Sequence, residues 1–197
     1  MFGIILLFSS FIFGGLLIEN YDILSQYISE SYAIDTKFGI FLRVFGYIPS
    51  GIMITLFCLL GLNHFQPNKL LKIGFYGIGI FYGLGTIVTG IFPCDSGCNR
   101  ELIEPSFSQV VHNFSALMMY QLTPFFIILI GLGLKKSIYL RFTIQSVIIG
   151  VTSYFFVFTL GSDLSSEYNG IYQRIIEFFF GFWVLLCAFE IKKTASQ

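Results

Sequence analysis

Apolar runs long enough to cross a lipid bilayer recur through the sequence and constrain its fold more than any other feature. A helical crossing takes about 20 apolar residues. We place six such runs at residues 2–18, 38–62, 71–92, 109–134, 137–160 and 173–191. An open sheet would leave unsatisfied hydrogen bonds in lipid, and the runs lack the alternation of barrel strands. The sequence therefore predicts an all-α, polytopic membrane bundle of six transmembrane helices, with residues 1–197 forming a single domain.

The composition supports this membrane location. Hydrophobic residues make up 55% of the chain and charged residues only 11%, whereas soluble domains carry about 25% charged residues. The formal net charge is zero, which gives no reason to expect a nucleic-acid partner. The first run has the length of a signal peptide, but it lacks a basic start and a small-residue cleavage site. We therefore expect it to be a retained helix.

Basic and acidic residues segregate between alternate connections, which sets the predicted orientation. One set of connections, with the C-terminal tail, carries seven of the eleven basic residues: Lys69, Lys72, Lys135, Lys136, Arg141, Lys192 and Lys193. The other set carries ten of the eleven acidic residues: Glu19, Asp22, Glu30, Asp35, Asp95, Glu101, Glu104, Asp163, Glu167 and Glu177. Since Lys and Arg mark cytoplasmic loops, we expect both termini in the cytoplasm and the first, third and fifth loops outside.

Glycines are frequent in the third apolar run. Gly79 and Gly83 are separated by four residues, so a helix would place them one turn apart on the same face. Small residues at this spacing let two membrane helices approach closely. We therefore predict that this face packs against a neighbouring helix.

The segment Pro93-Cys94-Asp95-Ser96-Gly97-Cys98 forms a compact polar loop between two apolar runs. Three intervening residues, including Gly97, allow a reversal tight enough to bond the two cysteines, and an outside location permits a disulfide. A structural disulfide between Cys94 and Cys98 is therefore the favoured interpretation. Free thiols, a redox pair and a metal site are the alternatives, although redox pairs favour two intervening residues.

Ionisable side chains from five parts of the chain share one predicted level, at or just below the outer surface. They are Glu30, Arg43, Asp95, His112, Arg174 and Glu177. An ionisable group inside a membrane is costly and by default suggests a functional site. The alternative is a structural ion pair between Glu177 and either arginine. His64 lies at the opposite surface, about 30 Å from His112, so the two histidines cannot share a metal. We predict a ligand site formed by the six residues, with no metal or cofactor.

Four segments, in order, resemble a family of bacterial and archaeal six-helix membrane proteins known as DUF998. Residues 21–30 are similar to its first outer loop, residues 92–98 to its hallmark loop, His112 to the histidine that opens its fourth helix, and residues 170–174 to the entry of its last helix. The chain departs from the family at Ser96, where Pro is frequent, and at Ser31, near which a Gly is usual. The resemblance implies a multi-pass protein of a bacterial or archaeal plasma membrane.

The same resemblance extends in layout to the Frag1/DRAM/Sfk1 group, whose members are linked to membrane lipids. Likeness of fold does not establish function. The resemblance therefore supports the architecture and supplies no reaction.

Three functions are compatible with the predicted site. The first is an outward-facing polar pocket for a lipid headgroup or small amphiphile. Arg43 and Arg174 would attract phosphate or carboxylate, while Glu30, Asp95 and His112 orient the ligand. The second is an enzyme acting on a lipid-like substrate, with His112 as general base and Asp95 as its partner, although no nucleophile motif supports it. The third is a structural subunit or chaperone of a larger membrane complex. The expected partners are membrane lipids, or a membrane protein in the third case.

Overall fold

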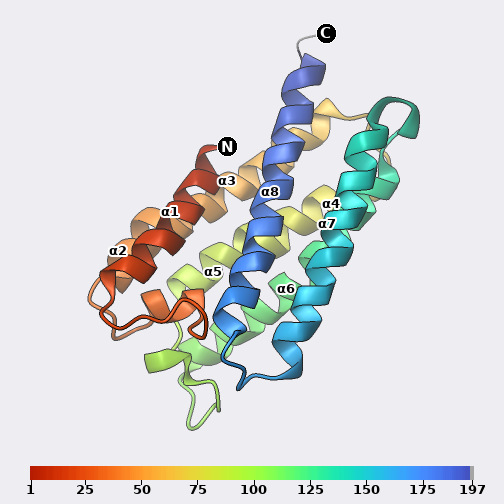
Figure 1. Ribbon diagram of the computed structural model, residues 1–197. Helices are drawn as coiled ribbons and strands as arrows, with labels where there is room; N and C mark the ends of the chain where they lie inside the picture. Colours follow the sequence, from red (N-terminus) through yellow and green to blue (C-terminus); the bar gives the residue numbers. More distant parts are fainter. Residues whose placement is uncertain (196–197) are drawn as a thin grey trace.

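The computed structural model describes residues 1–195, and these residues form helices and connections without a β-strand (Figure 1). Helices that follow one another end to end make two long rods. The first rod contains α2 (Gly39–Leu42), the π-helical η2 (Arg43–Tyr47) and α3 (Ile48–Gly61). The second contains α4 (Lys69–Ile78), the π-helical η4 (Gly79–Leu84) and α5 (Gly85–Ile91). The predicted helical class is confirmed.

The other rods are single helices. They are α1 (Phe2–Leu17), α6 (Phe107–Gly133), α7 (Lys136–Ser162) and α8 (Asn169–Ala195). Three short 3₁₀ turns occupy connections or rod ends: η1 (Ile28–Tyr32), η3 (Leu62–His64) and η5 (Ser96–Asn99). Of these, η1 and η5 lie within the two longest connections, so these loops have defined local structure.

Among residues 1–195, four helical segments are long and apolar enough to cross a membrane. They are Gly39–His64, Lys69–Ile91, Phe107–Gly133 and Ser137–Ser162. The helix α1 is a shorter apolar helix of 16 residues. A multi-pass membrane bundle agrees with these findings, while the count of six crossings and the side of each terminus stay predictions.

The connections gather at two opposite ends of the bundle. Residue 1, the end of α8 and the short connections 62–68 and 134–135 lie at one end (Figure 1). The longer connections 18–38, 92–106 and 163–168 lie at the other, which we call the long-loop end. The three predicted outer loops therefore share one end of the molecule.

Aromatic residues fill the core toward the end that holds the termini. Trp183 on α8 is fully buried, and its ring lies 6.4 Å from Phe75 and 6.1 Å from Phe142 between centroids. Its indole N–H donates to the Ser146 hydroxyl at 3.0 Å. Since a buried indole N–H needs an acceptor, this bond lets α7 and α8 pack on a large ring without an unsatisfied polar group.

Glycines bring the two long rods into close contact. A Cβ built on Gly83 would lie 2.8 Å from the backbone nitrogen of Thr55 and 3.0 Å from its Cα, and a Cβ on Gly79 would meet Cys58 at 3.4 Å. The same face of η4 thus rests on α3, as the spacing predicted. Backbone atoms cannot move aside as a flexible side chain can, so a side chain at Gly83 would force the two rods apart.

Replacing Gly83 with alanine should therefore destabilise the protein. Overpacking of this kind costs about 1–3 kcal/mol, and thermal unfolding in detergent measures it. Gly161→Ala is the matched control, because a Cβ there meets nothing within 4 Å and should leave stability equal or slightly higher. Equal stability of Gly83→Ala and Gly161→Ala would contradict the close contact.

Candidate functional site

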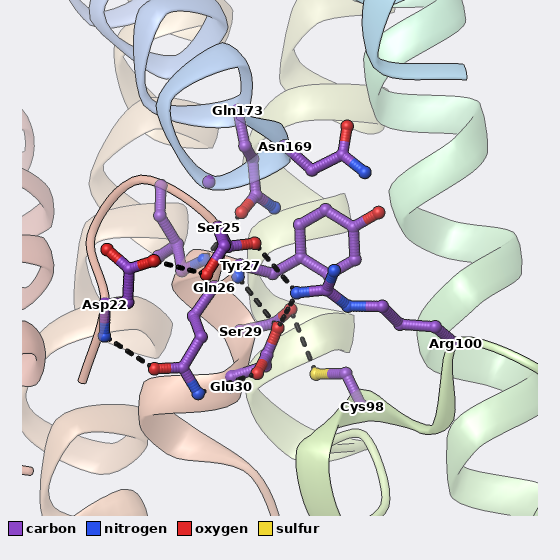
Figure 2. A network of polar contacts seen from close by, with 12 residues as sticks. Asp22, Ser25, Gln26, Tyr27, Ser29, Glu30, Cys98, Arg100, Asn169 and Gln173 are labelled. Carbon is purple, nitrogen blue, oxygen red and sulfur yellow. Dashed lines mark hydrogen bonds and ion pairs between the residues drawn. The ribbon is translucent and has the colours of Figure 1, made fainter. Parts of the chain in front are cut away.

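The first long loop folds inward over the bundle at the long-loop end. All five residues of its turn η1 are buried. Glu30 in this turn accepts hydrogen bonds from Arg100 Nη2 at 2.6 Å and from the Tyr27 backbone N–H at 2.9 Å (Figure 2). Arg100 also donates to the Ser25 carbonyl at 2.8 Å and stacks over the Tyr27 ring at 4.3 Å. The Arg100 guanidinium, which belongs to the third connection, therefore holds the first connection in place.

Cys94 and Cys98 lie at disulfide-bonding distance, with Cα atoms 4.8 Å apart, as predicted. The turn between them has Gly97 and Cys98 in the left-handed region, at φ values of 60° and 55°. The pair is buried against Ala33, and the Ser29 hydroxyl lies 3.2 Å from Cys98 Sγ. The disulfide thus supports the first loop as well as closing its own turn.

Asp95 caps the following helix instead of pointing at His112, which corrects the expected orientation. Its carboxylate accepts from the Ser106 backbone N–H at 3.0 Å and from the Ser106 hydroxyl at 2.5 Å. Ser106 is the N-cap of α6. These two bonds hold the pKa of Asp95 below its usual range. The Asp95 carboxylate therefore joins the disulfide turn to the start of α6.

Arg174 anchors the first loop to the start of α8. Its Nη1 donates to the carbonyls of Ile23, Gln26 and Gly170 at 3.0, 2.9 and 2.8 Å, and Nη2 donates to the Tyr21 hydroxyl at 2.7 Å. Glu30 forms an ion pair with Arg100, and among the described residues Glu177 forms no ion pair with Arg174 or Arg43, which was the alternative to a ligand site. Arg43 donates from Nε to the Gly39 carbonyl at 3.2 Å, within its own helix.

A cavity of about 350 Å³ lies beneath these loops. Its wall combines the turn η1 with α1, the two long rods, α6, α7 and α8. His112 and Glu177 are the members of the predicted six that line it, together with Arg100. Glu30, Arg43, Asp95 and Arg174 are not among its lining residues, although Glu30 reaches its edge through Arg100.

Glu177 is the acidic group in the cavity wall, and it is 5% exposed. Its carboxylate accepts one hydrogen bond from the Tyr82 hydroxyl and one from the Tyr120 hydroxyl, each at 3.0 Å. The Tyr120 oxygen accepts from Gln173 Nε2 at 2.9 Å, and Gln173 Oε1 accepts from the Ile28 backbone N–H at 2.6 Å. A continuous chain of hydrogen bonds therefore links the turn η1 to the carboxylate.

His112 is 4% exposed and also lines the cavity. Its Nδ1 lies 2.9 Å from the carbonyl oxygen of Phe92. A carbonyl can only accept, so Nδ1 carries the hydrogen. The bonded pair with Asp95 that the enzyme hypothesis needs is not formed, because His112 is held by the end of α5 and Asp95 by Ser106.

Both π-helical segments present a buried tyrosine at this site. Tyr47 ends η2 and lines the cavity, and Tyr82 lies in η4 and bonds Glu177. The Tyr47 hydroxyl is buried without a hydrogen-bond partner. A π-helical turn shifts the register of the residues that follow it and is frequent at functional sites. In this bundle both π-helical segments lie where polar groups enter an otherwise apolar core.

The exposed residues of the cavity lining come from α6, from the end of α7 and from the residues just after it, so the cavity opens there. Leu117 on α6 is 52% exposed, and Leu164 just beyond α7 is 55% exposed. Exposed Gln121 and Gly161 accompany them in the lining. The wall thus changes from aliphatic at its exposed edge to carboxylate and tyrosine at its buried side.

Sequence reasoning missed Arg100, Tyr82, Tyr120 and Gln173. Gln173 and Glu177 are four residues apart, a spacing that puts two polar groups on one face of an apolar helix, and this was the available signal. The tyrosines looked like ordinary members of aromatic-rich runs. Arg100 lies in a loop, where a cation has no distinguishing pattern.

A family model described as a protein of unknown function, DUF998, matches residues 1–190. The match covers nearly the whole chain and confirms the resemblance to this family. No curated protein and no solved structure matches the chain.

The Arg100–Glu30 pair should contribute measurably to stability. Arg100→Ala would leave the buried Glu30 carboxylate without its cation, at a cost of about 1–3 kcal/mol in the free energy of unfolding. Arg141→Ala, an exposed arginine at the other end of the bundle, should change it by less than about 0.5 kcal/mol. Combining Arg100→Ala with Glu30→Gln should cost less than the sum of the single changes. Additive costs measured by thermal unfolding would contradict the pairing.

The cap made by Asp95 predicts a dependence on pH. Because its folded-state pKa is lowered, the stability that it contributes is present above the unfolded pKa of about 3.9 and is lost as the pH falls through the lower folded value. The melting temperatures of the wild type and Asp95→Asn should therefore differ at neutral pH and converge under strong acid. A difference that stays constant down to acid pH would contradict the cap.

Proposed function

The chain belongs to the DUF998 family of proteins of unknown function, and we propose that it is a membrane protein that binds a lipid headgroup or small amphiphile. In this proposal it crosses the plasma membrane of a bacterium or archaeon six times. Its termini are cytoplasmic, and the long-loop end faces outward. The charge distribution between the two ends supports this orientation.

The cavity is the observation that carries the proposal. Its volume of about 350 Å³ is within the range of small-molecule sites, which are about 300–1,000 Å³. Such sites combine apolar walls with a few polar groups that fix the ligand's orientation. Glu177, Tyr120 and His112 are polar groups of this kind in the wall.

The position of the opening favours an amphiphile over a water-soluble ligand. Leu117 and Leu164 at the opening are exposed, and α6 and α7 both meet the length and hydropathy of membrane spans. An acyl chain could stay against these helices in the bilayer while its headgroup enters between them. The headgroup would then exchange water for polar partners without removing the chain from lipid.

Filling the cavity tests the proposal. Ala116 on α6 lines it, so Ala116→Trp should occupy the space that a headgroup needs. Val110→Trp is the control, because Val110 is on the same helix, is 51% exposed and is not a lining residue. Native mass spectrometry of gently extracted protein should find a bound amphiphile on the wild type and on Val110→Trp.

Occupancy on Ala116→Trp should fall about tenfold, which corresponds to a loss of about 1.4 kcal/mol. Two results would overturn the proposal. One is wild-type protein that retains no amphiphile, and the other is Ala116→Trp protein that retains as much as the control.

A further inference from the structure

We propose that the group recognised in the cavity is an ammonium, with Glu177 as its counter-charge. The inference rests on the proposed function and assigns the chemistry of the headgroup. It replaces the expectation that two arginines attract a phosphate or carboxylate. Four observations carry it: the bonding of Glu177, the aromatic wall, the hydroxyl of Tyr47 and the engagement of every nearby arginine.

Glu177 has donors but no cation. Its two hydrogen bonds come from tyrosine hydroxyls, and among the described residues no Lys or Arg forms an ion pair with it. A carboxylate removed from water is costly unless a charge compensates it. A carboxylate has about four acceptor positions, and the tyrosines use one on each oxygen. The remaining positions can accept N–H groups from a bound ammonium.

Aromatic rings line the same cavity close to this acid. The ring centroids of Tyr32 and Tyr47 are 4.2 Å apart, Phe11 lies 6.0 Å from Tyr47, and His112 lies 6.1 Å from Tyr32. All four line the cavity. The faces of aromatic rings attract cations, and recognition sites for quaternary ammonium groups are built from such rings. The same faces carry partial negative charge and disfavour an anion.

The Tyr47 hydroxyl is a buried polar group of this wall without a hydrogen-bond partner among the described residues. It is 2% exposed and makes no hydrogen bond. A buried hydroxyl without a partner costs free energy, so its presence in the fold calls for an explanation. An ammonium has three donors and no acceptor, so one bound at Glu177 could also donate to this oxygen once the Tyr47 side chain turns toward the cavity.

The arginines near the cavity are committed elsewhere. Arg100 bonds Glu30 and the Ser25 carbonyl and stacks on Tyr27. Arg174 bonds three carbonyls and the Tyr21 hydroxyl, and neither it nor Arg43 lines the cavity. An anionic headgroup would thus meet one neutralised cation and the repulsion of Glu177. The charges favour the opposite sign of ligand.

The test offers the delipidated, full-length protein equal amounts of phosphatidylethanolamine and phosphatidylglycerol with identical acyl chains. Native mass spectrometry should show the wild type retaining the ethanolamine lipid about tenfold more than the glycerol lipid. Glu177→Gln should reduce this preference to within about twofold, because the isosteric amide carries no charge, while it can accept from one tyrosine hydroxyl and donate to the other. Glu101→Gln changes an exposed acid in the third connection and should keep the preference.

Tyr47→Phe provides an independent variant. Its hydroxyl has no hydrogen-bond partner among the described residues, so its removal should leave folding intact. Retention of the ethanolamine lipid should fall about threefold, as for the loss of one neutral hydrogen bond. Unchanged retention by Tyr47→Phe, together with an unchanged preference in Glu177→Gln, would overturn the ammonium assignment.

Two added amines identify the source of the group. Hexadecylamine, which carries an ammonium on an acyl-length chain without phosphate, should displace the ethanolamine lipid from the wild type. Failure of hexadecylamine to displace it would count against recognition of the ammonium. Free ethanolamine that competes equally well would identify a soluble amine in place of a lipid as the ligand.

The two proposals fail in different ways. Wild-type protein that binds both lipids equally, or prefers the glycerol lipid, would refute the ammonium inference and leave the binding of an amphiphile standing. Wild-type protein that binds neither lipid nor hexadecylamine would refute the proposed function itself.

Discussion

The buried carboxylate of Glu177 and its two tyrosine donors are the interaction on which the site depends. An acid in an apolar bundle requires polar partners from several elements, and these are Tyr82 from η4 and Tyr120 from α6. Gln173 then links the same network to the first loop. Burial of one ionisable group therefore couples the second long rod, α6 and α8 to the first loop.

At the long-loop end, polar side chains of the first connection meet Arg100 and Cys98 of the third (Figure 2). Three devices hold the first loop in place: the Arg100–Glu30 ion pair, the carbonyl bonds of Arg174, and contact with the cysteine pair at Ser29. Each of these three contacts uses a residue that the sequence analysis singled out, namely Glu30, Arg174 or the cysteine pair. In the structure these residues hold the loop that covers the cavity. The groups that can contact a ligand are the lining residues beneath that loop.

The apolar runs, the glycine face and the cysteine pair could be predicted because each depends on local pattern alone. The site could be predicted only in part. His112 and Glu177 were found because ionisable groups are rare in such runs, whereas Arg100 and the tyrosines have no local signal. Two π-helical turns also shift the register of Tyr47 and Tyr82, and helical periodicity cannot anticipate that shift. Glu30 and Arg100 are 70 positions apart in the sequence, so their pairing depends on tertiary packing and has no local signal.

A structure of the protein determined in lipid nanodiscs that contain phosphatidylethanolamine tests the central claim most directly. The account predicts elongated density that enters between α6 and α7 and ends within about 3 Å of the Glu177 carboxylate, the length of a hydrogen bond. The side chains of Tyr32 and Tyr47 should lie beside the end of that density. A cavity that holds only water, or lipid density confined to the outer surface of α6 and α7, would contradict it.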